Sequence, residues 1–287
     1  MTGRLAAEVE RRLAAGEPVV LVTVDQARGS TPRAAGTCMA VTMDSTAGTI
    51  GGGRLEWEAT GHARDMIARG ETSEVLDMAL GPSVGQCCGG HVVLRLDRAD
   101  ADALAALTAD EARARQDAPQ AVVFGAGHVG KALVRALEPL PIRVSWSDTR
   151  PDQFPADTGA TVEIEHSDPL DLVNQADTGA AVVAMTHSHA LDYAITAEAL
   201  NRGDLAYVGM IGSRTKRRRF ERWFTARGGD PRALHRLVCP IGEVGVIDKR
   251  PEVIAAFVAA ETMHALALWQ ARLDEPMEDD KREASAS

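Results

Sequence analysis

The sequence is poor in aromatic residues and in cysteine, and each shortage argues against a class of function. Phe, Trp and Tyr make up 4% of the 287 residues, too few for a surface that stacks the bases of single-stranded nucleic acid. The four cysteines are Cys38, Cys239 and the adjacent pair Cys87 and Cys88. That spacing does not suit a disulfide framework and is typical of a reducing compartment. We therefore expect a cytoplasmic protein whose thiols are either buried or chemically active.

Basic charge and long apolar runs are also scarce. The chain carries 31 Lys and Arg against 41 Asp and Glu, a net charge of −10, so most of its surface repels nucleic acid. The first residues lack the apolar core of a signal peptide, and no later run reaches the roughly 18 uncharged apolar residues of a membrane helix. Neither nucleic acid nor a membrane is expected as a partner, and the composition is that of an ordinary globular protein.

The chain divides by composition into two folded blocks, a linker and a tail. Residues 1–97 form the first block. Residues 98–118 are mostly Ala, Asp, Glu and Arg, and we expect them to link the blocks as a solvated segment. Residues 119–274 alternate strand and helix patterns, which predicts an α/β fold with a parallel sheet and crossover helices. Residues 275–287 are small and charged, and we expect them to be disordered.

Apolar periodicity and helix-end signals place the main elements. In the first block they predict helices over residues 5–15 and 54–68 and strands over residues 18–24, 38–43 and 91–96. In the second block they predict strands over residues 121–124, 143–146, 181–185 and 206–211, helices that end near residues 137 and 201, and a long apolar helix that Pro251 opens.

A glycine pattern follows the first predicted strand of the second block. It is the G-x-G-x-x-G turn of dinucleotide-binding folds, in which the first glycine permits a tight turn, the second lets a phosphate approach and the third lets helix pack on strand. An acid 23 residues after the first glycine stands where a ribose-binding carboxylate would lie. A bound NAD and a fold that has lost or changed its ligand fit this pattern equally well. The residues concerned are Gly125, Gly127, His128, Gly130 and Asp148.

Three segments of the first block combine a flexible backbone with groups that bind anions or metals. Arg28-Gly-Ser30-Thr-Pro-Arg33 offers two guanidinium groups and two hydroxyls. Gly51-Gly52-Gly53 precedes a predicted helix with Glu56 near its first turn. Gln86-Cys87-Cys88-Gly89-Gly90 offers two thiols, which are soft ligands and nucleophiles when ionised. Without any ligand, a surface turn with solvated arginines explains the first segment, a tight connection that needs positive φ explains the second, and buried thiols explain the third.

Two segments of the second block place polar groups just after strands. Thr186-His187-Ser188-His189 closes a predicted strand, and its histidines can bind a metal or donate to an oxyanion, although no third metal ligand is identifiable. Asp192 is expected to cap the helix that follows. A second glycine turn then carries six basic residues between Arg214 and Arg222. This basic segment suits a phosphate, an acidic partner or simply a solvated helix face.

Six of these segments resemble the XdhC/CoxI family of xanthine dehydrogenase accessory proteins, together with the turn Cys239-Pro-Ile-Gly242, whose thiol we expect to be structural. They occur in the family's order and extend the resemblance from about residue 18 to residue 270. The resemblance implies an N-terminal XdhC-type α/β domain followed by a C-terminal Rossmann-like domain. The matching segments are residues 29–33, 48–53, 80–90, 124–130, 186–189, 209–214 and 239–242.

The same resemblance implies a chaperone's task and no catalytic residues. The family binds the molybdenum cofactor (molybdopterin), supports the exchange of an oxo for a sulfido ligand, and inserts the cofactor into the xanthine dehydrogenase of purine catabolism. The implied partners are the molybdenum-binding subunit of that enzyme and a cysteine desulfurase, and we also expect a homo-oligomer, in the first instance a dimer. No resident metal is expected, and a nucleotide at the glycine turn is a further option. The expected cofactor-binding residues are Gln86, Cys87, Cys88, Ser30, Arg33, Gly51, Gly52, Gly53, Glu56, His187 and His189.

Two enzyme classes compete with that interpretation. An NAD(P)-dependent oxidoreductase would use the glycine turn, but no Tyr-x-x-x-Lys or comparable acid–base pair follows the fold, and the chain has only two tyrosines. A metal-dependent enzyme would be built on His187 and His189. Ligand binding by the purified protein discriminates these classes from the chaperone.

Overall fold

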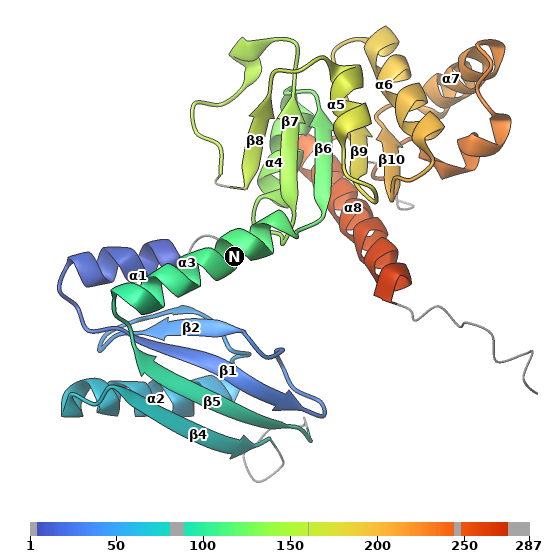
Figure 1. Ribbon diagram of the computed structural model, residues 1–287. Helices are drawn as coiled ribbons and strands as arrows, with labels where there is room; N and C mark the ends of the chain where they lie inside the picture. The colour runs from blue at the N-terminus through green and yellow to red at the C-terminus, as the bar shows by residue number, and fades with distance from the viewer. Residues whose placement is uncertain (1–4, 81–88, 160, 244–247, 275–287) are drawn as a thin grey trace, which may run out of the picture. The chain divides into compact units, whose positions relative to one another are not determined.

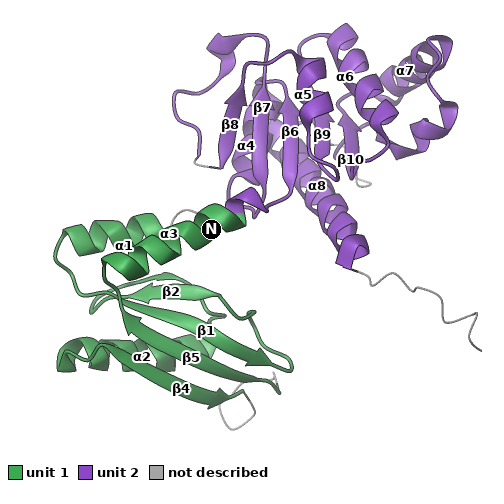
Figure 2. Cartoon of the chain, in the orientation of Figure 1, with its two compact units in different colours: residues 1–114 green, residues 115–287 purple. Residues whose placement is uncertain are grey.

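The chain folds into two compact units in the computed structural model, which describes residues 5–80, 89–159, 161–243 and 248–274 (Figure 1). Unit 1 comprises residues 1–114 and unit 2 residues 115–287 (Figure 2). The division falls inside helix α3 (Ala101–Gln116), which has no buried residue. The segment expected to link the blocks is therefore helical and largely solvated along its described length.

Unit 1 is an antiparallel five-stranded sheet with helices on both faces. The strand order is β3 (Thr46–Gly48), β2 (Cys38–Val41), β1 (Val20–Arg28), β5 (His91–Arg98) and β4 (Ser73–Ala79). Helix α2 (Gly53–Arg69) buries its apolar side against one face through residues such as Leu55 and Met66. Helices α1 (Leu5–Ala14) and α3 cover Leu21 and Ala40 on the other face (Figure 1).

Two strands of unit 1, β3 and β4, are not predicted by the apolar pattern of the sequence, for physical reasons. Strand β3 is only three residues long, which is too short to show an alternation. Strand β4 lies at the edge of the sheet, and none of its seven residues is buried: Glu74, Leu76 and Met78 are half-buried, and the residues between them are exposed. An edge strand with one partner buries too little to require large apolar residues.

Unit 2 is a doubly wound Rossmann-type domain, which confirms the predicted α/β fold with a parallel sheet. Its six parallel strands lie in the order β11 (Leu237–Val238), β10 (Tyr207–Met210), β9 (Ala181–Ala184), β6 (Gln120–Phe124), β7 (Arg143–Ser147) and β8 (Val162–Glu165). Helices α4 (His128–Leu137) and α8 (Pro251–Asp274) pack on one face, and α5 (Pro169–Gln175), α6 (His189–Arg202) and α7 (Arg214–Ala226) on the other. The chain reverses direction across the sheet between β6 and β9, the position where such sheets bind ligands.

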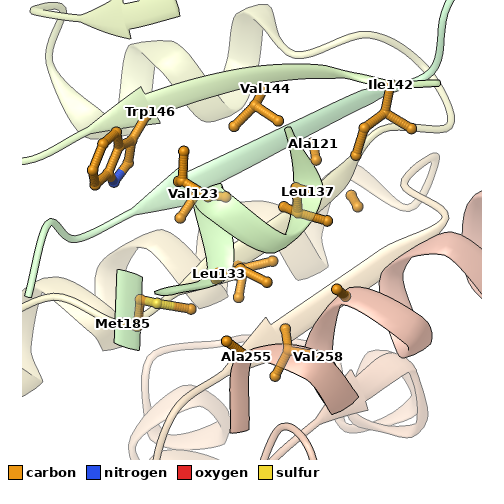
Figure 3. Packing of buried hydrophobic residues seen from close by; sticks show 14 of the residues in the cluster. Ala121, Val123, Leu133, Leu137, Ile142, Val144, Trp146, Met185, Ala255 and Val258 are labelled. Atoms are coloured by element: carbon orange, nitrogen blue, oxygen red, sulfur yellow. The ribbon is translucent and has the colours of Figure 1, made fainter. Parts of the chain in front are cut away.

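The core of unit 2 explains the long apolar helix at its end. Leu133 and Leu137 of α4 lie among Val123 of β6 and Ala255 and Val258 of α8, all fully or almost fully buried (Figure 3). By length and composition alone, α8 is the one helix in the described part of the chain that could cross a membrane. Five of its 24 residues are buried, among them Ala255 and Val258, which pack against α4, and a single such helix is weak evidence for insertion.

Candidate functional site

The glycine turn between β6 and α4 has the geometry of a dinucleotide-binding turn. A side chain at Gly125 would collide with the carbonyl of Met185, and one at Gly130 would collide with the carbonyl of Gly125. Gly127, the N-cap of α4, faces open space, and His128 begins the helix as an exposed residue. Gly125 and Gly130 thus serve the close packing of the turn, and Gly127 leaves room for a group to approach.

Asp148 stands at the end of β7, where the sequence places a ribose-binding acid, but its carboxylate is already engaged. Oδ2 accepts from the Ala126 amide at 2.6 Å, and Arg150 donates Nε to Oδ1 at 3.0 Å and Nη2 to Oδ2 at 2.9 Å. Burial opposes ionisation, yet the hydrogen bonds from Arg150 and from the amides of Ala126 and Arg150 outweigh it and lower the pKa of Asp148. Only 1% of the side chain is exposed, so this acid braces the glycine turn internally.

A cavity of about 310 Å³ opens one strand further along, at the carboxyl ends of β9 and β10. The hollow beside it, lined by Phe124, Asp148 and Thr186, is too small to hold a water molecule. The open cavity is lined by Thr186, His187 and His189 from the first polar segment and by Ser213, Thr215 and Arg219 from the second. Parallel strands end at the same edge, so two motifs 20 to 30 residues apart in sequence meet in one place.

A buried ion pair forms part of this cavity's lining and corrects the role expected for Asp192. The cap of α6 is Ser188, whose hydroxyl accepts from the Leu191 amide at 3.4 Å. Asp192 is fully buried: Oδ2 lies 2.5 Å from Lys216 Nζ, and Oδ1 accepts from the amide and hydroxyl of Thr186 at 2.7 and 2.8 Å. Lys216 also donates to the carbonyl of Ile211 at 2.8 Å.

His187 and His189 are exposed at the rim of the cavity and do not form a metal centre by themselves. Across the parts of the chain that the structure describes, no group of three or more His, Cys, Asp and Glu side chains is arranged to hold a metal ion. The imidazoles can instead donate hydrogen bonds into the cavity.

The glycine-rich segments of unit 1 meet where β1 ends, β5 begins and α2 starts. A Cβ atom at Gly51 would lie 2.6 Å from the ring of Pro32, and one at Gly90 would collide with the carbonyl of Ser30. The backbone of residues 28–33 therefore approaches that of Gly90 directly, and the Pro32 ring packs on Gly51. Ser30 and Arg33 are exposed beside this contact, which we call the unit 1 loop cluster (residues 28–33, 49–53 and 89–90).

The Glu56 carboxylate binds the amides of the turn before α2, where the sequence predicts that an external anion could bind. Its Oε2 accepts from the Thr49 hydroxyl at 2.6 Å, the Gly52 amide at 3.0 Å and the Ile50 amide at 3.2 Å. A carboxylate at the start of a helix also complements the helix dipole. The donors of the glycine turn are thus partly satisfied from within, and the exposed groups left for a ligand in this cluster include those of Ser30 and Arg33.

Two of the four cysteines can be placed. Cys239 is buried, and burial raises the pKa of its thiol to about 11, consistent with the structural role expected for it. Cys38 is half-buried beside the Thr23 hydroxyl, and burial raises its thiol pKa as well. Gln86, Cys87 and Cys88 lie outside the described residues, so their expected role stays a prediction.

The residues predicted for one cofactor site fall in two units. Ser30, Arg33, the glycine turn and Glu56 belong to unit 1, whereas His187 and His189 line the cavity of unit 2. The sequence offers no signal for the Asp192–Lys216 pair, because its members are 24 residues apart and Lys216 stands in a run of arginines.

Known proteins resemble both units. Residues 121–262 match the family described as the XdhC Rossmann domain, and residues 12–78 match the XdhC and CoxI family. A crystal structure described as a xanthine dehydrogenase from Bacillus halodurans aligns with a TM-score of 0.68 and 17% identity, covering 96% of this chain and 98% of that one, which shows a shared fold. YqeB of Escherichia coli K12, an uncharacterized protein, is 24% identical over 269 residues. That alignment covers 86% of this chain but 43% of YqeB, less than half of its length.

Proposed function

Because the chain belongs to the XdhC and CoxI family, we propose that it is an accessory protein for a xanthine dehydrogenase and is not itself the catalyst. In this proposal it binds the molybdenum cofactor in the cytoplasm, supports its sulfuration with a cysteine desulfurase, and passes it to the molybdenum-binding subunit of the dehydrogenase. The observation that carries the proposal is the unit 1 loop cluster, in which three motifs distant in sequence meet.

The chemistry of the unit 1 loop cluster fits the proposed ligand. Molybdopterin presents a phosphate, a flat pterin and a dithiolene that holds the metal, so its site needs oxyanion donors and close access to the backbone. Gly52 and Gly89 face open space and provide that access, and the Arg33 guanidinium and Ser30 hydroxyl are donors suited to phosphate. Since Glu56 occupies the amides of Ile50 and Gly52, we place the phosphate at Ser30 and Arg33.

The thiols Cys87 and Cys88 precede Gly89 of the loop cluster directly in the chain. A thiolate is softer than any oxygen ligand nearby and suits molybdenum and sulfur chemistry. Because consecutive side chains generally point apart, we assign the molybdenum contact to one of the two thiols and take Cys87 as the first candidate.

Cofactor retention by purified variants tests this assignment. We expect Arg33→Ala to lower the molybdenum and pterin that co-purify with the chain while its melting temperature stays close to the parent's, since an exposed substitution costs about 0.5 kcal/mol or less. Arg69→Ala, at the opposite end of α2, is the matched control and should retain the parent's content. Cys87→Ser, Cys88→Ser and the double variant should show at least one loss.

Two outcomes contradict the proposal at different levels. Full retention in Arg33→Ala and in all three cysteine variants would remove the loop cluster as the cofactor site. A strain without this gene that keeps normal dehydrogenase activity would remove the accessory role itself.

The rival function, an NAD(P)-dependent oxidoreductase, is disfavoured by Asp148. That carboxylate already accepts four hydrogen bonds from Ala126 and Arg150, so a ribose hydroxyl has to displace one of them to bind. Titration with NADH discriminates the two functions: saturable NADH binding together with turnover would favour the enzyme, and a co-eluting molybdenum pterin favours the accessory protein.

A further inference from the structure

We propose that the cavity at the carboxyl ends of β9 and β10 binds a small phosphate monoester through Arg219 and the polar groups around it. The site lies in unit 2, and the proposal does not depend on the accessory role. Its volume of about 310 Å³ is at the lower end for small-molecule pockets, which suits a compact ligand and not a dinucleotide.

Asp192 and Lys216 of the cavity lining neutralise each other, which leaves the positive charge of Arg219 unbalanced. Asp192 is the acid in the lining, and it is neutralised by Lys216 at 2.5 Å and by two hydrogen bonds from Thr186. Arg214 forms its ion pair with Glu243 and is outside the lining. Arg219 is exposed at the cavity, where its planar guanidinium can hold two phosphate oxygens at once.

Hydroxyl and imidazole donors surround that guanidinium. The Ser213 hydroxyl accepts from the Lys216 amide at 3.2 Å, which leaves its own hydrogen available to a ligand. Thr215 and the imidazoles of His187 and His189 lie in the same lining. Together these donors are more numerous than the two oxygens of a carboxylate can use. Their number suits the three terminal oxygens of a phosphate monoester.

The backbone reinforces the same preference. Helices α6 and α7, 14 and 13 residues long, both begin at the cavity, and their first-turn amides have no partner within the helix. Both caps, Ser188 and Ser213, are uncharged, and the acid in the first turn of α6, Asp192, is neutralised by Lys216 of α7, so neither the caps nor this acid cancels the positive ends of the two dipoles.

Binding of AMP, adenosine and inorganic phosphate to the full chain tests the site by calorimetry and by ³¹P line broadening, at constant ionic strength set with sodium chloride. We expect AMP to bind saturably, inorganic phosphate to compete with it, and adenosine not to bind. Adenosine binding as tightly as AMP, or no phosphate effect beyond that of chloride, would overturn the proposal.

Matched variants locate the binding. Arg219→Ala should weaken AMP at least tenfold, whereas Arg218→Ala, on the same helix but outside the lining, should change it less than twofold. Thr215→Glu should abolish binding by repulsion without unfolding α7, because an acid in the first turn suits the helix dipole; the uncharged Thr215→Gln should still bind. Equal affinity in Arg219→Ala, Thr215→Glu and the parent would place AMP elsewhere and refute the assignment.

The same variants identify the source of the phosphate. If Arg219→Ala also lowers the co-purifying pterin, the cavity holds the phosphate of molybdopterin. If the pterin content is unchanged while AMP binding falls, the cavity serves another phosphate ester. Failure of the accessory role would show in the deletion strain and would leave the AMP measurement unaffected.

Discussion

Removing the amino group of Lys216 should destabilise unit 2 strongly, because it strands a buried acid. In the parent, Asp192 is fully buried and its Oδ2 lies 2.5 Å from Lys216 Nζ. Lys216→Met keeps the aliphatic volume and removes the charge. The Asp192 carboxylate would then keep only the two hydrogen bonds from Thr186.

The magnitude follows from the distance. At 2.5 Å and an effective dielectric constant of about 20, the attraction is about 6–7 kcal/mol before desolvation is subtracted. Breaking one side of such a buried pair costs about 3–5 kcal/mol. For a domain of this size, that loss lowers the melting temperature by roughly 6–20 °C. The double variant Lys216→Met with Asp192→Asn removes both charges, so we expect it to recover at least about 2 kcal/mol relative to the sum of the two single losses.

Tryptophan fluorescence can follow unit 2 selectively. Trp146, Trp223 and Trp269 lie in unit 2, and Trp57 of unit 1 is 76% exposed, so Trp57→Phe provides a background in which the signal reports unit 2 alone. Arg218→Met is the control for loss of a cation from α7 and should stay within about 0.5 kcal/mol of the parent. Losses that add up in the double variant, or a Lys216→Met melt equal to that of Arg218→Met, would refute the coupling.

Two further predictions concern Glu56 and Cys239. Glu56→Ala should lower the free energy of unfolding in urea by about 1–3 kcal/mol, since the amides of Ile50 and Gly52 lose a charged acceptor. The control Glu58→Ala breaks only the exposed pair with Arg54 and should lower it by less than about 1 kcal/mol. Equal losses in the two variants would show that Glu56 is not structural. The Cys239 thiol has its pKa raised by burial from 9.0 to about 11, so the unfolded chain loses its proton first as pH rises. Stability should therefore fall between pH 9 and 11 by about 2–3 kcal/mol, and Cys239→Ser should remove that part of the slope; an unchanged slope in Cys239→Ser would contradict the assignment.

Local signals in the sequence predict the parts of the fold that depend on local chemistry. The apolar run 121–124 and the glycines after it predict β6, the turn and the start of α4, because steric limits on those glycines act within a few residues. Strand β4 does not show in the sequence, since an edge strand with half-exposed residues carries little apolar signal.

The candidate site is likewise predictable from the sequence only in part. Both polar segments at the carboxyl ends of β9 and β10 can be located in the sequence, because each directly follows a buried strand. Their meeting in one cavity, and the pairing of Asp192 with Lys216, arise only when the sheet assembles. Glu56 accepts hydrogen bonds from amides of the glycine turn that an external anion could otherwise use. The spacing of the residues in the sequence does not predict which of the two anions binds there.

The starts of helices α2, α4, α6 and α7 divide into two electrostatic kinds. The starts of α2 and α4 each carry their own anion, Glu56 and Asp148, and a diphosphate arriving there would be a second negative charge at an already compensated helix end. The starts of α6 and α7 have neutral serine caps, and Asp192 in the first turn of α6 is neutralised by Lys216 in the first turn of α7. The glycine-rich turns that stand out in the sequence are thus self-neutralised, and spare positive potential resides at the two serine-capped ends that carry no glycine signature of a dinucleotide site.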